Sequence, residues 1–89
     1  NRPEAETAKR AELGNILIAV APNDRIWMNK APIELEAVKI MMELAHAENP
    51  ESSVVIVADE LASTGLVLDI MDQIRLSGIS KISLSAKEK

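Results

Sequence analysis

Two apolar runs constrain the fold more than any other feature of this 89-residue chain. NILIAVA (15–21) and VVIVA (54–58) are apolar at nearly every position, which is typical of β-strands that are buried on both faces. Only two segments have apolar residues at helical spacing, and two short helices can cover one face of a sheet but not both. The sequence therefore predicts a second apolar sheet face that another polypeptide covers.

Turn and strand signals divide the rest of the chain into short elements. PNDR (22–25) is typical of a turn and IWMN (26–29) of a short return strand, so the first unit is a predicted hairpin. KAP (30–32) is expected to interrupt the chain before a helix. KISLSA (81–86) alternates apolar and polar residues, which predicts a last strand. Its inward side chains would be Ile82, Leu84 and Ala86.

Helical spacing predicts one helix over 33–48 and a second that begins near Ser63 or Thr64 and ends before Gly78. The predicted order is β-β-α-β-α-β, with the last two strands parallel through a right-handed crossover. The expected fold is an α+β two-layer sandwich, a four-stranded mixed sheet with two helices on one face. Residues 15–87 would form this domain, and residues 1–14 a flexible tether.

The core is predicted to be aliphatic, because Trp27 is the only aromatic residue. Residues on the apolar stripes of the two helices are expected to lie in the core, among them Met41, Met42, Leu44 and Met71. Ile40 and Leu76 fall off these stripes and add to the apolar surface that the chain leaves uncovered. Trp27 is either an interface anchor or a cap over one end of the core, and the sequence favours neither.

Composition excludes several classes of function. A formal net charge of −4, without a basic cluster or stacking aromatics, argues against nucleic-acid binding. The absence of cysteine excludes thiol catalysis, disulfides and cysteine-ligated zinc. The longest apolar run, ILIAVAP, is far shorter than the roughly 20 residues that a membrane helix needs. Because the chain starts at Asn1, we expect it to be a piece of a longer protein.

Asp59 and Glu60 are the main candidates for catalysis. They follow an apolar strand, where open α/β sheets keep ligand crevices. A catalytic carboxylate pair usually works with a base, a metal or a cofactor, and the sequence contains one His, no Tyr and no Gly-rich phosphate loop. The favoured interpretation is that Asp59 accepts hydrogen bonds from the following loop or the helix start. We therefore expect no enzymatic activity and no cofactor.

Metal binding is not expected either. His46 lies on the polar side of the first helix without a second histidine, so we predict a solvated side chain. Asp69 and Asp72 are one helical turn apart, but calcium requires more oxygen ligands than two carboxylates supply. Both aspartates are therefore predicted to lie on a solvated face.

The second half of the chain carries a recognisable pattern. It runs from VVIVAD (54–59) through Gly65 and the helix VLDIMDQIR (67–75) to GISKISL (78–84). This pattern resembles the carboxyl-terminal signature of the ExbD/TolR biopolymer-transport family, and the likeness extends more loosely over residues 15–87. Glu60 departs from the signature, since the family often has a basic residue there. Near the start, Arg2 replaces the leucine of a Leu-Pro motif to which Pro3 belongs.

The resemblance implies a role in energy transduction. Family members have one inner-membrane helix and a periplasmic domain, and they work as dimers inside a pentameric channel of ExbB/TolQ type. Proton flow through an Asp of the membrane helix becomes force on a periplasm-spanning transducer such as TonB or TolA. By this resemblance the chain is the periplasmic domain alone, at the periplasmic face of the inner membrane. The membrane helix and its Asp would lie outside this sequence.

The resemblance and the excess apolar surface together predict a partner or dimer interface. A strand edge accepts an extended segment by strand addition, and Leu84 matches a position that the family uses functionally. The candidate interface residues are Trp27, Asp59, Leu76, Lys81, Ile82 and Leu84. The alternatives are a peptidoglycan-binding anchoring module of the same family, and a small α/β enzyme that uses Asp59 and Glu60. The sequence identifies neither the transducer, nor the cargo, nor strand swapping in the dimer.

Overall fold

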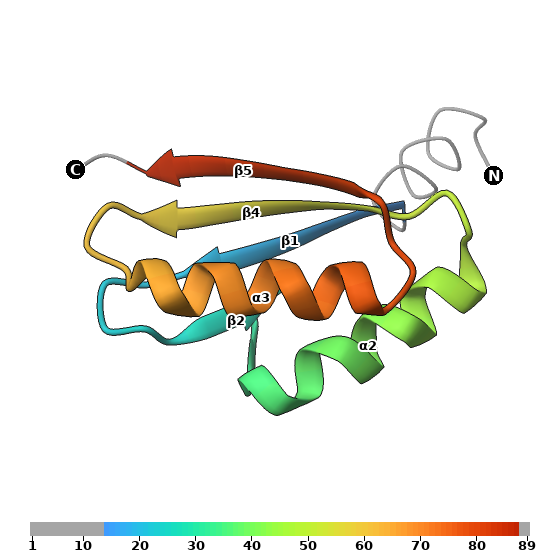
Figure 1. The fold of residues 1–89 in the computed structure, drawn as a ribbon, viewed down its shortest axis with the longest axis horizontal. Helices are drawn as coiled ribbons and strands as arrows, with labels where there is room; N and C mark the ends of the chain where they lie inside the picture. The colour runs from blue at the N-terminus through green and yellow to red at the C-terminus, as the bar shows by residue number, and fades with distance from the viewer. Residues whose placement is uncertain (1–13, 88–89) are drawn as a thin grey trace, which may run out of the picture.

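The computed structural model describes residues 14–87, which form a mixed sheet with both helices on one face (Figure 1). The sheet order is β3-β2-β1-β4-β5. β1 pairs antiparallel with β2 and parallel with β4, and β4 pairs parallel with β5 as predicted. The elements are β1 (Asn15–Val20), β2 (Ile26–Met28), β3 (Ala31–Ile33), α2 (Leu35–Glu48), β4 (Ser53–Asp59), α3 (Thr64–Leu76) and β5 (Lys81–Lys87). Neither helix of this described part is long and apolar enough to cross a membrane.

The sheet has five strands rather than the predicted four, because the chain reverses again at Asn29 and Lys30. Both residues have positive φ, 48° and 75°, as in the two-residue turns that join twisted antiparallel strands. The turn pairs Met28 with Ala31 and creates β3. Pro32 is tolerated in β3 because this strand lies at the sheet edge, where a missing N–H need not break a ladder. The prediction that KAP only interrupts the chain was therefore wrong.

The core lies between the two helices and one face of the sheet. In-register pairing sets Ile16 beside Val54 and Ile18 beside Ile56, and all four side chains are buried. The helices cover this aliphatic surface, and burial of apolar area is the main favourable contribution to folding. The largest fully buried side chains are Val38, Met42, Val54, Ile18, Ile56, Ile70, Ile74 and Ile79. The aliphatic core predicted from the sequence is confirmed.

Several apolar residues that were expected to lie in the core or to face inward are exposed. Met41 is 41% exposed and Leu44 is 56% exposed, because they lie on a flank of α2 that is turned away from the sheet. Leu84 is 52% exposed and Ala86 is also exposed. β5 ends the sheet order and extends beyond the helix layer, as Figure 1 shows, so the helices do not cover the inner face of this strand fully. Only Ile82 of the predicted inward residues packs against the core.

Gly78 follows α3 and makes room for the ring of His46. Its φ of 106° lies in the region that glycine adopts at little cost. A Cβ at this position would lie 3.1 Å from His46 Cδ2. The ring is half-buried, and its Nδ1 is buried without a hydrogen-bond partner among residues 14–87. The prediction of a solvated His46 was therefore wrong, because a residue without a side chain lets the ring pack inward.

We expect Gly78→Ala to lower the free energy of unfolding by about 2 kcal/mol, since alanine is strained at positive φ and its methyl group would crowd His46. Gly65→Ala is the matched control. Gly65 lies in α3, where the nearest atom to an added Cβ is Ser63 Oγ at 3.8 Å, so this change should be neutral or stabilising. Urea denaturation measures both variants, and equal losses would contradict this account of Gly78.

Candidate partner-binding site

β5 is the long free edge of the sheet. It has seven residues and ends the strand order, so one row of its backbone groups pairs with no other strand of residues 14–87. The opposite edge, β3, has three residues and contains Pro32. Short strands and proline protect an edge against further pairing, whereas a long strand without proline invites it. β5 is therefore the edge that is suited to accept a strand from another chain.

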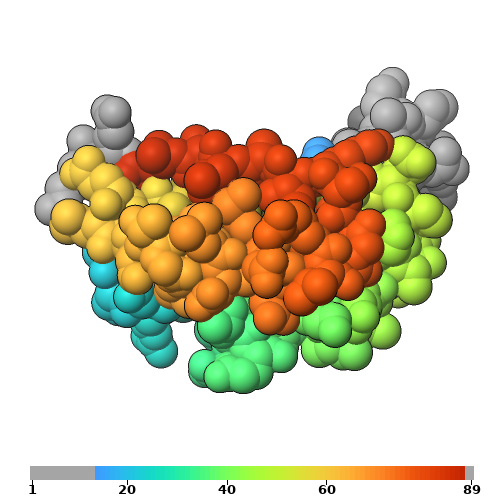
Figure 2. All heavy atoms as spheres, viewed as in Figure 1, coloured from blue at the N-terminus to red at the C-terminus, as the bar shows by residue number. Residues whose placement is uncertain are grey.

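A groove lies between β5 and the start of α3. Its volume is about 210 Å³. In Figure 2 the atoms of β5 (red) form the upper margin of the molecule above α3 (orange). A strand added to β5 would direct every second side chain to the helix side of the sheet, where the groove opens. The apolar lining consists of Ala58, Ala62, Val67, Leu84 and Ala86.

Asp59 lies at the groove, but its carboxylate takes part in a turn. Asp59 Oδ1 accepts a hydrogen bond of 2.9 Å from the N–H of Leu61. The local hydrogen bond that was predicted for Asp59 is thus confirmed. The next helix is capped by Ser63, whose Oγ accepts from the N–H of Leu66 at 3.5 Å. Glu60 is exposed, and residues 14–87 contain no cluster of three or more side chains positioned to hold a metal ion.

Contacts with two other elements fix this turn. Asp24, at a φ of 65°, accepts a hydrogen bond of 2.8 Å from the N–H of Ser63. The N–H of Glu60 donates to the carbonyl oxygen of Lys87 at 3.2 Å, which ties the end of β5 to the same turn. The sequence does not predict the Asp24–Ser63 contact, because no local pattern shows how two distant loops meet. The backbone at the end of the groove is therefore fixed both by Asp24 and by the end of β5.

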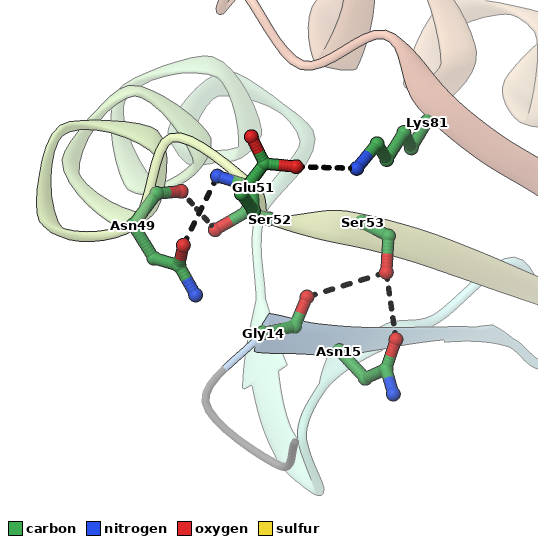
Figure 3. Close-up of polar contacts among 7 residues, drawn as sticks. All are labelled: Gly14, Asn15, Asn49, Glu51, Ser52, Ser53 and Lys81. Carbon is green, nitrogen blue, oxygen red and sulfur yellow. Dashed lines mark hydrogen bonds and ion pairs between the residues drawn. The ribbon is translucent and has the colours of Figure 1, made fainter. Parts of the chain in front are cut away.

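An ion pair holds the beginning of β5 (Figure 3). Lys81 Nζ lies 2.7 Å from Glu51 Oε1. Nearby, Ser53 Oγ lies 3.2 Å from the carbonyl oxygen of Gly14 and 2.6 Å from Asn15 Oδ1, which links the beginnings of β4 and β1. Lys81 and Glu51 are both exposed, so their pair contributes little to stability and chiefly orients the start of the strand.

The hydrogen bond and the charge of Lys81 hold the pKa of Glu51 below its ordinary value of 4.5. A lowered carboxyl pKa stabilises the folded state above the unfolded pKa, and this contribution is lost as the pH falls through the folded pKa. We expect an NMR titration of the Glu51 side chain to have its midpoint below 4.5, and Lys81→Gln to raise it. A midpoint that Lys81→Gln leaves unchanged would show that the pair does not form in solution.

Four of the interface residues proposed from the sequence lie in β5 or at the groove beside it. Asp59 and Leu84 line the groove, and Lys81 and Ile82 begin the strand. Leu76 is 60% exposed at the end of α3 and does not line the groove. Pro3 lies outside the described residues. The structure therefore brings only part of the predicted set together.

Trp27 belongs to a different surface, the second face of the sheet. It pairs with Ala19, and Ala19 pairs in turn with Val57. Leu17 and Val55 form the neighbouring pair of the same face. Leu17 is 40% exposed and the other four side chains are half-buried, while both helices lie against the opposite face (Figure 1). At β1, β2 and β4 the second face is apolar, as predicted, whereas β5 contributes Lys81, Ser83 and Ser85 to it.

Comparison with known proteins decides the family. The model of the family "Biopolymer transport protein ExbD/TolR" matches residues 1–89. The chain belongs to the ExbD/TolR family. It is also 32% identical over 88 residues, 99% of its length, to "Biopolymer transport protein exbD2" of Vibrio cholerae serotype O1 (strain El Tor Inaba N16961). The chain spans 66% of the length of that relative.

Membership in the ExbD/TolR family sets the context of the site. The family consists of biopolymer transport proteins that are associated with the inner membrane, and the resemblance stated from residues 54–84 is confirmed. Free strand edges and uncovered apolar faces are features through which proteins commonly bind other polypeptides.

Proposed function

We propose that this chain is the periplasmic domain of an ExbD/TolR-type subunit that couples the proton motive force to transport by binding a periplasm-spanning transducer of TonB or TolA type. The observation that carries the proposal is the free edge of β5 beside the apolar groove. Strand addition there would supply backbone hydrogen bonds for affinity, and the groove would select the side chains of the added segment. Family membership supports the setting of energy transduction.

In this function the sheet would transmit the pulling force between the bound transducer and the membrane. β5, β4 and β1 are successive parallel neighbours, so a pull on a strand added to β5 is spread over their hydrogen-bond ladders. Gly14 leads into β1 and lies beside Ser53 at the start of β4. The load would pass from β1 into residues 1–14 and on to a membrane helix that contacts an ExbB/TolQ-type channel subunit.

We also infer that the domain forms a homodimer that covers the second face. An aromatic side chain within an apolar patch is typical of interface anchors, and Trp27 has this position beside Ala19. Removing Leu17, Trp27 and Val55 from water would favour association. The exposed fraction of Leu17, 40%, supports this use of the surface.

Transducer binding is tested by titrating isotopically labelled protein with a synthetic peptide from the linker of a TonB- or TolA-type transducer. We expect amide shifts over residues 81–87 and around Asp59. The control is the same peptide with proline at alternate positions, which cannot complete a ladder of hydrogen bonds and should not bind. Shifts that avoid β5, or that survive in the proline peptide, would contradict strand addition.

Dimerisation is tested by light scattering at rising protein concentration. We expect the measured mass to rise from that of one chain to that of two. Trp27→Ala should shift this transition to concentrations about tenfold higher, because an interface anchor is lost. A parent protein that stays monomeric at millimolar concentration would contradict the dimer while leaving the proposal for β5 intact.

A further inference from the structure

Helix α2 has apolar residues on two sides. Val38 and Met42 are fully buried and face the core. Ile40 is 53% exposed, and Met41 and Leu44 are also exposed on the outer flank. A helix that only covers a sheet has one apolar face and one polar face, so large apolar side chains on the outer flank are not needed for this fold.

The spacing of the outer residues is that of a helix which packs on another helix. Ala37, Ile40, Leu44 and Ala47 follow one another at intervals of three, four and three residues, as in the seam of a coiled coil. Met41 widens the seam at one side. We call this surface the α2 stripe, and it consists of Ala37, Ile40, Met41, Leu44 and Ala47. It does not overlap the β5 edge or the second face of the sheet.

Glutamates border the α2 stripe. Glu36 and Glu43 lie four residues before and three residues after Ile40, which makes them its neighbours on the helix surface. Glu48 lies four residues after Leu44 and is its neighbour on the helix surface. The two ion pairs found among residues 14–87 are Arg75–Asp72 and Lys81–Glu51, so neither involves these glutamates. The rim of the stripe is therefore acidic.

We propose that the α2 stripe is the docking surface for an amphipathic helix of a partner protein that carries lysine or arginine beside its apolar face. The apolar seam would bury Ile40 and Leu44, and the basic flanks would meet the acidic rim. A second copy of this chain fits less well, because an α2–α2 pair in either direction sets glutamates of the two copies against each other. An anionic membrane surface would be repelled for the same reason. This proposal stands independently of the function proposed for β5.

The probe is a synthetic helical peptide with leucine at seam spacing and lysine beside it, titrated into labelled protein. We expect amide shifts along residues 36–48. The double variant Ile40→Ala with Leu44→Ala should weaken binding about tenfold, since it removes the apolar contact. Glu36→Gln with Glu43→Gln should weaken binding about threefold at low salt, with less difference at high salt. Leu68→Ala is the control, because Leu68 is 59% exposed on α3.

Circular dichroism and urea unfolding should show that the variants fold like the parent, since the substituted positions contribute little to the core. Equal binding of a matched leucine/glutamate peptide would overturn the proposal, and so would binding that the Ile40/Leu44 variant leaves unchanged. Concentration-dependent shifts along 36–48 without peptide would assign the stripe to a second copy, and binding of phosphatidylglycerol vesicles there would assign it to a membrane. Either result overturns the proposal without touching the β5 test, whose readout is residues 81–87.

Discussion

Replacing Ile56 with alanine should lower the free energy of unfolding by about 3 to 4 kcal/mol, the largest loss expected from a single substitution in this domain. Ile56 is 0% exposed in the middle of β4, between Ile18 of β1 and Leu84 of β5. Its removal would leave a cavity under both helices. Because small domains are only marginally stable, we expect much of the variant to be unfolded at moderate temperature.

A pair of valines on the same strand provides the control for this prediction. Val54 is 1% exposed on the core face, whereas Val57 is half-buried on the second face. Val54→Ala and Val57→Ala delete the same atoms, and we expect the first to cost about 2 kcal/mol and the second about 1 kcal/mol or less. Urea denaturation at concentrations where the chain is monomeric measures all three variants. Equal losses for the two valines would contradict a core on one face of the sheet.

Replacing Leu84 with aspartate should reduce binding of the transducer peptide about a hundredfold while changing the free energy of unfolding by about 1 kcal/mol or less. Leu84 and Val67 both line the groove, and Leu84 is 52% exposed, so it is available to a partner and only partly used by the fold. A carboxylate there would have to be desolvated when an apolar side chain enters the groove, which opposes binding strongly.

The control variant Ser83→Asp distinguishes the contribution of the groove to binding from that of the strand edge. Ser83 precedes Leu84 on β5, is exposed, and pairs with Val55 on the second face of the sheet. It adds the same charge to the same strand but not to the groove, so we expect it to weaken binding by about threefold or less. If Ser83→Asp and Leu84→Asp weaken binding equally, the groove does not select the partner. Isothermal titration calorimetry measures affinity, and the unfolding curve of each variant measures stability.

The elements that were predicted well are those with strong local patterns. β1 and β4 follow from continuous apolar runs, and α2 and α3 from helical spacing and the cap at Ser63. β3 was missed because its turn contains Lys30 at a φ of 75°, where the recognisable turn signal is glycine. An L-residue in that conformation is tolerated when the pairing of the flanking strands compensates, and a local pattern does not report such pairing.

In the candidate site, too, the features with a local sequence pattern were predicted and those that depend on distant contacts were not. Alternation in KISLSA predicted a strand whose inward side carries Leu84, but it did not show whether the helices cover that side chain. Whether a side chain on the inner face is buried depends on how far the helix layer extends, and here it ends short of β5. The hydrogen bond from Ser63 to Asp24 and the packing of His46 on Gly78 likewise join residues that are distant in sequence.

By itself, the sequence determined the α+β class, the aliphatic core and the excess of apolar sheet surface, because these follow from the period and number of apolar residues. Only the tertiary structure decided which strand edge stays open, which leucines line a groove and which flank of α2 is left apolar. These properties depend on the positions of elements relative to one another, and the energies that set those positions are summed over contacts between distant parts of the chain.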